Sequence, residues 1–249
     1  MIVLKSKKEL EIMREAGKIT AGALCAVQEQ IQPGVTTAYL NRVAEEYIMR
    51  YNAIPAFKGY NGFPASICAS VNAQVVHGFP NDIPLKEGDI ISIDIGAFYK
   101  GYCGDAARTF PVGNISDEAA ALIKTTKESF FEGLKYARLG YRLSDISHAI
   151  QSYVEARGFS VVKSFVGHGI GQNMHEDPQV PNYGLPGMGP RLRPGMTLAI
   201  EPMVNLGTDE VEILADGWTV LTRDRRLSAH YENTVAITDG DPLILTSEG

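Results

Sequence analysis

This sequence of 249 residues contains few cysteines, a single tryptophan and no long apolar run. The cysteines are Cys25, Cys68 and Cys103, an odd set without the spacing of a thiolate metal site, which favours a reducing compartment over a disulfide framework. No stretch of about 18 apolar residues is present, and the short apolar run at the N-terminus is not a signal peptide. We therefore expect a soluble, cytoplasmic protein that has no membrane partner.

Positive charge is also scarce. Lysine and arginine number 23 against 29 aspartates and glutamates, which gives a formal net charge of −6. This balance argues against nucleic acid as a substrate. A hydrophobic share of 45% and a charged share of 21% are ordinary for a globular protein with a well-buried core.

What the sequence does contain is an internal repeat in which each copy ends in an acid. Residues 85–94 read LKEGDIISID and residues 192–201 read LRPGMTLAIE. Each copy has a leucine, a base, a turn glycine and an apolar strand pattern, closed by Asp94 or by Glu201. Such a repeat indicates an ancient duplication.

A second pair of acids supports the duplication. Asp105 and Glu232 each begin a strand pattern that reaches a glycine eight residues later. A duplication would bring four acids to equivalent places in two facing halves, and four carboxylates in a fold interior require cations. The simplest organisation is one domain, residues 1–249, made of two related halves at about 1–115 and 116–249.

Hydrophobic periodicity predicts two helices followed by strands in each half. The expected helices cover about 7–30, 36–51, 116–138 and 144–158, and the expected strands lie near 66–71, 90–98, 161–166, 197–204, 210–214, 219–222 and 230–238. Residues 167–195 are rich in Gly and Pro and are expected to form a functional loop. This order of elements indicates an α+β fold, with the helices on one side of an antiparallel sheet.

Two acids on one predicted hairpin are candidates for a metal site. Asp94 interrupts an apolar strand pattern, and Asp105 follows after a glycine-rich turn, so the returning strand can set the two side by side. Either acid alone could instead be satisfied by backbone amides or occupy a turn. Because an unpaired buried carboxylate is costly, the pair favours a bound metal.

The other candidates lie in short motifs further along the chain. His168 and His175 belong to GHGIGQNMHEDP, whose glycines suggest backbone close to a bulky group, although a plain surface loop is the alternative. Strand alternation puts His230 on the same face as Glu232, which could otherwise be an exposed acid. His77 ends QVVHG and could equally be a hydrogen-bonded histidine at the edge of the core.

Taken together, these motifs resemble those of the methionine aminopeptidases. The motifs are VVHGFP, IDIG followed by GDAARTF, GHGIGQNMHEDP, AIEP and HYENTVAI, and the resemblance covers essentially the whole chain. It implies the duplicated, pseudo-symmetric pita-bread fold shared by creatinase and the aminopeptidases of peptidase family M24. The segment between His168 and Glu201 is too short for the helical insertion of type II members, so the chain is similar to bacterial-style type I enzymes.

The resemblance implies a metal-dependent reaction at this site. The enzyme would remove the initiator methionine from peptides and nascent proteins when the second residue is small, with a hydroxide held between two metals attacking the first peptide bond. The two divalent ions would be Co, Mn, Fe or Zn, and the sequence does not name the physiological one. The implied ligands are Asp94, Asp105, His168, Glu201 and Glu232.

The resemblance also implies roles in catalysis and in substrate binding. Glu201 would transfer a proton to the leaving amine, His175 would stabilise the oxyanion, and His77 would contact the scissile amide nitrogen. The implied methionine pocket consists of Tyr60, Phe63, Cys68 and Trp218, for each of which core packing is the alternative. Met174 and Phe57 stand where bacterial relatives often have an aromatic residue and a cysteine, so the pocket's shape is expected to differ.

The implied partners are N-termini of peptides and nascent polypeptides. A nascent-chain substrate suggests contact with the ribosome, although no particular residue points to it, and nothing indicates an obligate subunit, so we expect a monomer. Three alternatives stay open. They are a prolidase or aminopeptidase P, which usually carries a long N-terminal domain; a metal-free, creatinase-like hydrolase; and an inactive binding protein of the same fold.

Overall fold

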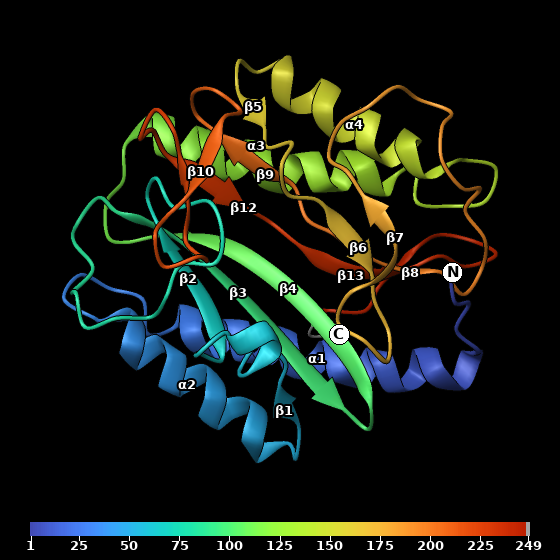
Figure 1. The fold of residues 1–249 in the computed structure, drawn as a ribbon, viewed down its shortest axis with the longest axis horizontal. Helices are drawn as coiled ribbons and strands as arrows, with labels where there is room; N and C mark the ends of the chain where they lie inside the picture. Colours follow the sequence, from blue (N-terminus) through green and yellow to red (C-terminus); the bar gives the residue numbers. More distant parts are fainter. Residues whose placement is uncertain (248–249) are drawn as a thin grey trace.

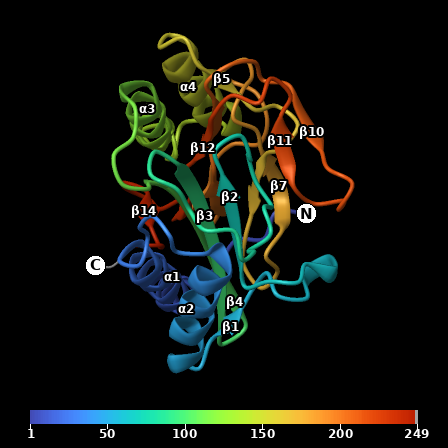
Figure 2. The same cartoon turned by 90° about the vertical axis from the view of Figure 1, so that its left-hand side faces the viewer.

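The computed structural model, which describes residues 1–247, combines helices with antiparallel sheets (Figure 1). The α-helices are α1 (Lys7–Gln28), α2 (Thr37–Arg50), α3 (Asp117–Leu134) and α4 (Leu143–Glu155). The view in Figure 2 places all four on the same side of the strands. Among the helices of residues 1–247, none combines the length and apolar character that a membrane span would need.

The strands preceding α3 form one antiparallel sheet around a long hairpin. They are β1 (Ile54–Pro55), β2 (Ile67–Val71), β3 (Ile90–Tyr99) and β4 (Tyr102–Pro111), and β3 pairs with each of the other three. In the β3–β4 register, Gly96 lies opposite Asp105 and Asp94 lies opposite Ala107. Asp94 and Asp105 are therefore diagonal neighbours on one face of the hairpin.

The strands that follow α4 form three further antiparallel sheets, of five, three and two strands. They are β5 (Ser160–Val161), β6 (Gly167–Gly169), β7 (Glu176–Val180), β8 (Thr197–Ile200), β9 (Met203–Asn205), β10 (Val211–Ile213), β11 (Val220–Thr222), β12 (Ser228–His230), β13 (Asn233–Ala236) and β14 (Leu243–Ile244). The sheets have the orders β14-β13-β8-β6-β7, β12-β9-β5 and β10-β11. The expected combination of helices with antiparallel sheets is confirmed.

The two parts of the chain are joined where β4 runs beside residues 230–234. The amide of Glu232 donates to the Ala107 carbonyl at 2.9 Å. The Thr234 hydroxyl accepts from the Asp105 amide and donates to the Asp105 carbonyl, at 3.0 Å in both cases. These bonds place Asp105 and Glu232 next to each other. The division into two duplicated halves stays a prediction.

The helices begin close to the predicted positions. Ser6 and Glu9 form the capping box of α1, and the Thr36 side chain caps α2. Helix α3 ends at Leu134, earlier than expected, because residues 135–142 form turns leading into α4. At Gly133 a Cβ atom would lie 2.8 Å from Ile150, so glycine allows α3 and α4 to pack closely.

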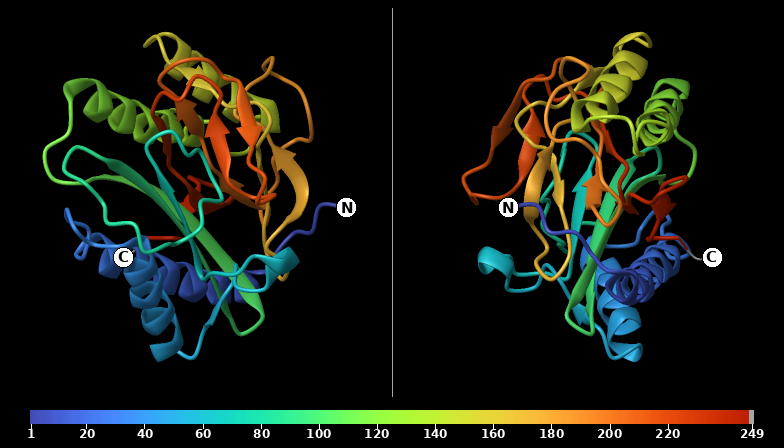
Figure 3. Two further views of the ribbon diagram at one scale, coloured as in Figure 1. Left: turned by 60° about the vertical axis from the view of Figure 1, so that its left-hand side comes forward. Right: turned by 90° about the vertical axis from the view of Figure 1, so that its right-hand side faces the viewer.

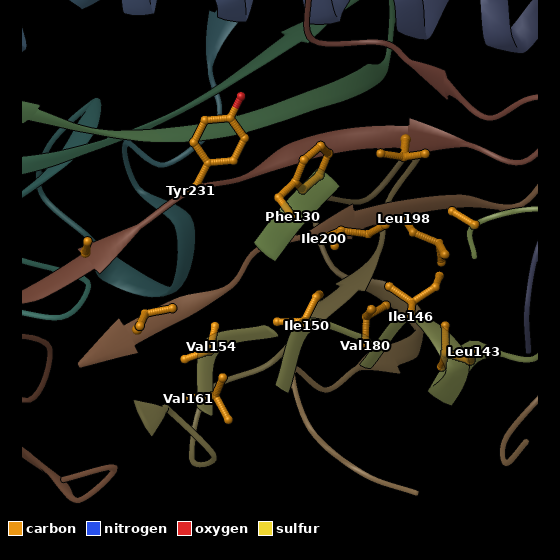
Figure 4. Close-up of a cluster of buried hydrophobic side chains, with 14 of the residues drawn as sticks. Phe130, Leu143, Ile146, Ile150, Val154, Val161, Val180, Leu198, Ile200 and Tyr231 are labelled. Carbon is orange, nitrogen blue, oxygen red and sulfur yellow. The ribbon is translucent and has the colours of Figure 1, made fainter. Parts of the chain in front are cut away.

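Each pair of helices encloses its own apolar core against strands. Figure 4 shows Phe130 of α3 with Ile146 and Ile150 of α4, facing Leu198 and Ile200 of β8. All five are fully buried. Burying such a side chain contributes roughly 1.5–3 kcal/mol, so these contacts hold α3 and α4 onto the sheet that carries part of the candidate site.

The structure corrects the expectations for four segments. Residues 167–195 contain β6 and β7 rather than only loop, because Gly167 and Gly169 let the strands approach closely: a Cβ at Gly169 would lie 2.1 Å from the Asp177 carbonyl oxygen. The strand expected at 161–166 is limited to β5. The two expected at 197–204 and 230–238 are each broken in two, at Glu201–Pro202 and at Tyr231–Glu232.

Candidate active site

A pocket of about 240 Å³ lies among side chains from both parts of the chain. It is lined by Phe57, Tyr60, Asn61, Phe63, Cys68, His77, Asp94, Asp105, His168, Met174, His175, Glu201, Trp218 and Glu232. Every site residue predicted from the sequence therefore lies in one pocket. The roles assigned to these residues stay predictions.

The four acids reach the pocket because each lies within a strand or next to the end of one. Asp94 and Asp105 come from the β3–β4 hairpin. Glu201 follows β8 directly, and Pro202, which has no amide hydrogen, cannot continue the ladder. Glu232 lies between β12 and β13, where its amide bonds to the carbonyl of Ala107 instead. The strand breaks thus occur at the positions that present carboxylates.

Burial perturbs the ionisation of all four acids. Burial and then the neighbouring Asp105 carboxylate raise the pKa values of Asp94, Glu201 and Glu232 well above the usual range. Burial also raises the pKa of Asp105 to about 7. Clustered carboxylates out of water repel one another, so the charged forms need a cation nearby.

The donor atoms in the cluster fit a divalent metal. Asp94 Oδ1, Asp105 Oδ1 and Glu232 Oε1 are buried and have no hydrogen-bond partner in the described residues. Ligand atoms of Asp105, His168 and Glu232 lie within 4.8 Å of one another. Carboxylate oxygens with one imidazole nitrogen suit Mn, Fe, Co or Zn. Buried orphan oxygens are costly, and a bound ion would satisfy them.

His168 is oriented as a metal-binding histidine would be. Its Nδ1 donates to the Gly169 carbonyl at 2.8 Å, which leaves the Nε2 lone pair facing the acids. That Nε2 lies 3.6 Å from Glu201 Oε1 and 4.0 Å from Asp105 Oδ2. Burial lowers the pKa of His168 to about 4, which keeps the ring neutral near pH 7.

Two further histidines face the same space. The rings of His175 and His168 lie 4.2 Å apart, and the Tyr60 hydroxyl is 2.8 Å from His175 Nδ1. Figure 3 shows the short 3-10 helix at Tyr60–Gly62 beside the segment that leads into β7. His77 has a φ of 60°, which is strained for a residue other than glycine and fits a functional position.

Aromatic and sulfur-containing side chains form an apolar wall next to the acids. Phe63 packs edge-on against Trp218, with ring centroids 5.1 Å apart. Met174 and Cys68 are buried beside them, and burial raises the pKa of the Cys68 thiol, which argues against a thiolate ligand. Asn61 also lines the pocket and was not predicted; its Asn-Gly turn signal was the only indication.

Metal-free protein is expected to lose stability as the pH rises above about 6.5. The pKa values of the four acids are raised, so the folded state retains protons that the unfolded state has released, and stability falls with pH. The lowered pKa values of His77, His168, His175 and His230 act in the opposite direction, but only below their unfolded value of 6.5.

The measurement is chemical denaturation with a chelator present, from about pH 6 to about pH 9. The free energy of unfolding should fall by up to about 1.4 kcal/mol per pH unit for each proton retained. A divalent ion in excess should restore much of the loss, since it binds the folded state. A metal-free protein that became more stable over this range would contradict the expectation.

Comparison with known proteins points to one family. The model of metallopeptidase family M24 matches residues 11–239. The chain is 60% identical to a methionine aminopeptidase of Clostridium acetobutylicum, with 99% of both chains covered. It also matches the crystal structure of methionine aminopeptidase from Thermotoga maritima with a TM-score of 0.98 and 46% identity, over 100% of both chains.

A more distant likeness concerns the fold alone. The prolidase from Pyrococcus horikoshii matches with a TM-score of 0.80 at 23% identity, and the match covers 100% of this chain but 65% of the prolidase. The pita-bread architecture is thus shared with peptidases of other specificity. The substrate therefore has to be inferred from the residues that line the pocket.

Proposed function

This chain belongs to metallopeptidase family M24, and on that premise we propose that it hydrolyses the first peptide bond of peptides and nascent proteins that begin with methionine. The second residue of the substrate would be small. The observation that carries the proposal is the single pocket in which buried acids and histidines adjoin an apolar wall containing Phe63 and Trp218. Such a wall suits an unbranched thioether side chain.

We further propose that the pocket holds two divalent ions. Asp94 would bind one ion, His168 and Glu201 the other, and Asp105 and Glu232 both. Divalent ions in such a site lower the pKa of water and polarise a carbonyl group. The orphaned carboxylate oxygens support this assignment over a metal-free hydrolase or an inactive binding protein.

The chain's own residues would orient the substrate and move protons. Glu201 would accept a proton and pass it to the leaving amine. His175 would donate from Nε2 to the developing oxyanion, an orientation that results when the Tyr60 hydroxyl donates to Nδ1. His77 would contact the scissile amide nitrogen, and its ring packs edge-on against Phe165 and Trp218.

The proposed function is tested with metal-stripped protein and the peptide Met-Ala-Ser. Hydrolysis should appear when Co, Mn, Fe or Zn is added back. The relative rates of hydrolysis with these ions identify those the site prefers. An Xaa-Pro peptide serves as the control, because prolidases and aminopeptidases P cleave it. Absence of Met-Ala-Ser cleavage with every ion, or faster cleavage of the Xaa-Pro peptide, would overturn the proposal.

Replacing His175 by alanine is expected to lower kcat by about 10²–10³-fold, because the oxyanion would lose a donor. Metal affinity should not change, since His175 is not among the proposed ligands. Steady-state kinetics together with a metal titration measures both quantities. His148→Ala on α4 is a matched control, because that ring bonds to Gly184 outside the pocket. Unchanged turnover in the His175 variant would refute its role.

The remaining proposals concern the protein's surroundings. A nascent chain as the physiological substrate would make the ribosome a partner and the cytoplasm the place of action. We also propose that the chain acts as a monomer, because the pocket is completed by residues of one chain.

A further inference from the structure

His230 faces the acid cluster although none of the proposed roles uses it. It ends β12, two residues before Glu232, and its Nε2 lies 4.0 Å from Glu232 Oε2. Only 1% of the residue is exposed, and Nε2 is buried without a hydrogen-bond partner in the described residues. A buried polar atom of this kind calls for an explanation.

The two oxygens of Glu201 point towards different histidines. Oε1 lies 3.6 Å from His168 Nε2, and Oε2 lies 3.6 Å from His230 Nε2. The carboxylate therefore stands between two imidazoles. If Oε1 joins His168 in binding an ion, Oε2 is left facing His230 and can accept a hydrogen bond from it.

The backbone of His230 is fixed by the first part of the chain. Its amide donates to the Thr109 hydroxyl at 2.8 Å, and that hydroxyl donates back to the His230 carbonyl at 2.9 Å. Ser92 contacts the same hydroxyl at 2.8 Å. Pairing of β12 with β9 sets His230 opposite Met203. With its backbone held in this way and its ring buried, His230 has little freedom, which suits a group that orients another side chain.

We propose that His230 is a positioning residue whose Nε2–H donates a hydrogen bond to Oε2 of Glu201. This leaves Oε1 to bind the ion shared with His168, and it prevents the carboxylate from rotating or binding with both oxygens. The inference rests on the proposed function, because it assumes that Glu201 is a metal ligand. It holds for the neutral Nε2–H tautomer and for the imidazolium, since both carry hydrogen at Nε2.

The test compares two substitutions of similar size, His230→Gln and His230→Met, of which only glutamine retains an N–H donor. Mn²⁺ titration of metal-stripped protein by calorimetry should show about 10–100-fold weaker binding at one of two sites in the methionine variant. On Met-Ala-Ser its kcat should fall by a similar factor while KM changes little. The glutamine variant should bind and turn over nearly as the unchanged protein does. His148→Gln is the control for histidine loss.

A measurement on the unchanged protein covers the case in which the methionine variant does not fold. In the Zn²⁺-loaded protein, ¹⁵N NMR of the imidazoles should show hydrogen on Nε2 of His230. An unprotonated Nε2, or a glutamine variant as impaired as the methionine variant, would overturn the proposal. So would the loss of a whole equivalent of bound metal in the glutamine variant, because His230 would then be a ligand itself. Inactivity of the unchanged protein would count against the proposed function. The NMR measurement of the hydrogen on Nε2 would still test the role of His230 in that case.

Discussion

Replacing Glu201 by glutamine is expected to reduce kcat by about 10²–10⁴-fold, because the group proposed to carry the proton is lost. The substitution keeps the size and shape of the side chain, so the pocket should keep its form. Glutamine also removes one negative charge from the cluster, which should weaken binding at the ion proposed to be shared with His168. Steady-state kinetics over a range of metal concentrations separates the two effects, since only the second is overcome by excess metal.

The same substitution should stabilise the metal-free protein. Burial raises the pKa of Glu201 well above its usual range, so its ionised form opposes folding at neutral pH, and glutamine cannot ionise. Function and stability should therefore change in opposite directions, as in many active sites. Glu210→Gln is the control, because the Glu210 side chain is 62% exposed and lies outside the pocket. Wild-type turnover in the Glu201 variant would remove Glu201 from the mechanism.

Replacing Lys5 by methionine is expected to destabilise the protein by about 3–5 kcal/mol, because it leaves a nearly buried carboxylate without its partner. Lys5 forms an ion pair with Glu176, and the two side chains are 3% and 9% exposed. The other Glu176 oxygen accepts from the Asn173 amide at 3.1 Å. The Lys5 amide also bonds to the Gly195 carbonyl at 2.7 Å, so Lys5 itself is held at both its side chain and its backbone.

This ion pair should affect the reaction as well as the fold, because Glu176 directly follows His175. Loss of Lys5 should loosen residues 171–176 and lower kcat more than it weakens metal binding. Denaturant unfolding measures the first effect and kinetics the second. The double variant Lys5→Met with Glu176→Gln should recover much of the stability, since no unpaired charge remains. Lys18→Met, at a solvent-exposed pair on α1, is the control. A loss below about 1 kcal/mol would mean that the pair acts like a surface salt bridge.

Several features of the site could be predicted because they depend on short stretches of sequence. A predicted hairpin set Asp94 and Asp105 side by side, and the register confirms that they are neighbours. The motif resemblance assigned residues far apart in the sequence, such as His77 and Trp218, to one site. Both line the same pocket in the structure. The starts of α1 and α2 were predicted closely, because the caps at Ser6 and Thr36 act within a single helical turn.

Features that depend on distant contacts were missed. The glycines of residues 167–169 favoured a loop, but they allow close packing of β6 against β7 and β8. The Lys5–Glu176 pair joins residues far apart in the chain, and neither has a local pattern that marks it. His230 was placed on the same face as Glu232, but its proximity to Glu201 could not be foreseen, because His230 ends β12 and Glu201 follows β8.

The sequence by itself determined which side chains are available and on which face of a strand or helix each one lies, because these properties follow from residue type and local periodicity. Only the tertiary structure decided how the acids face one another and which oxygen of Glu201 faces which histidine. That outcome depends on β4 lying against residues 230–234, where Thr109 and Thr234 bond across the junction. No local propensity specifies such a contact, since it forms only when both sheets have folded and packed together.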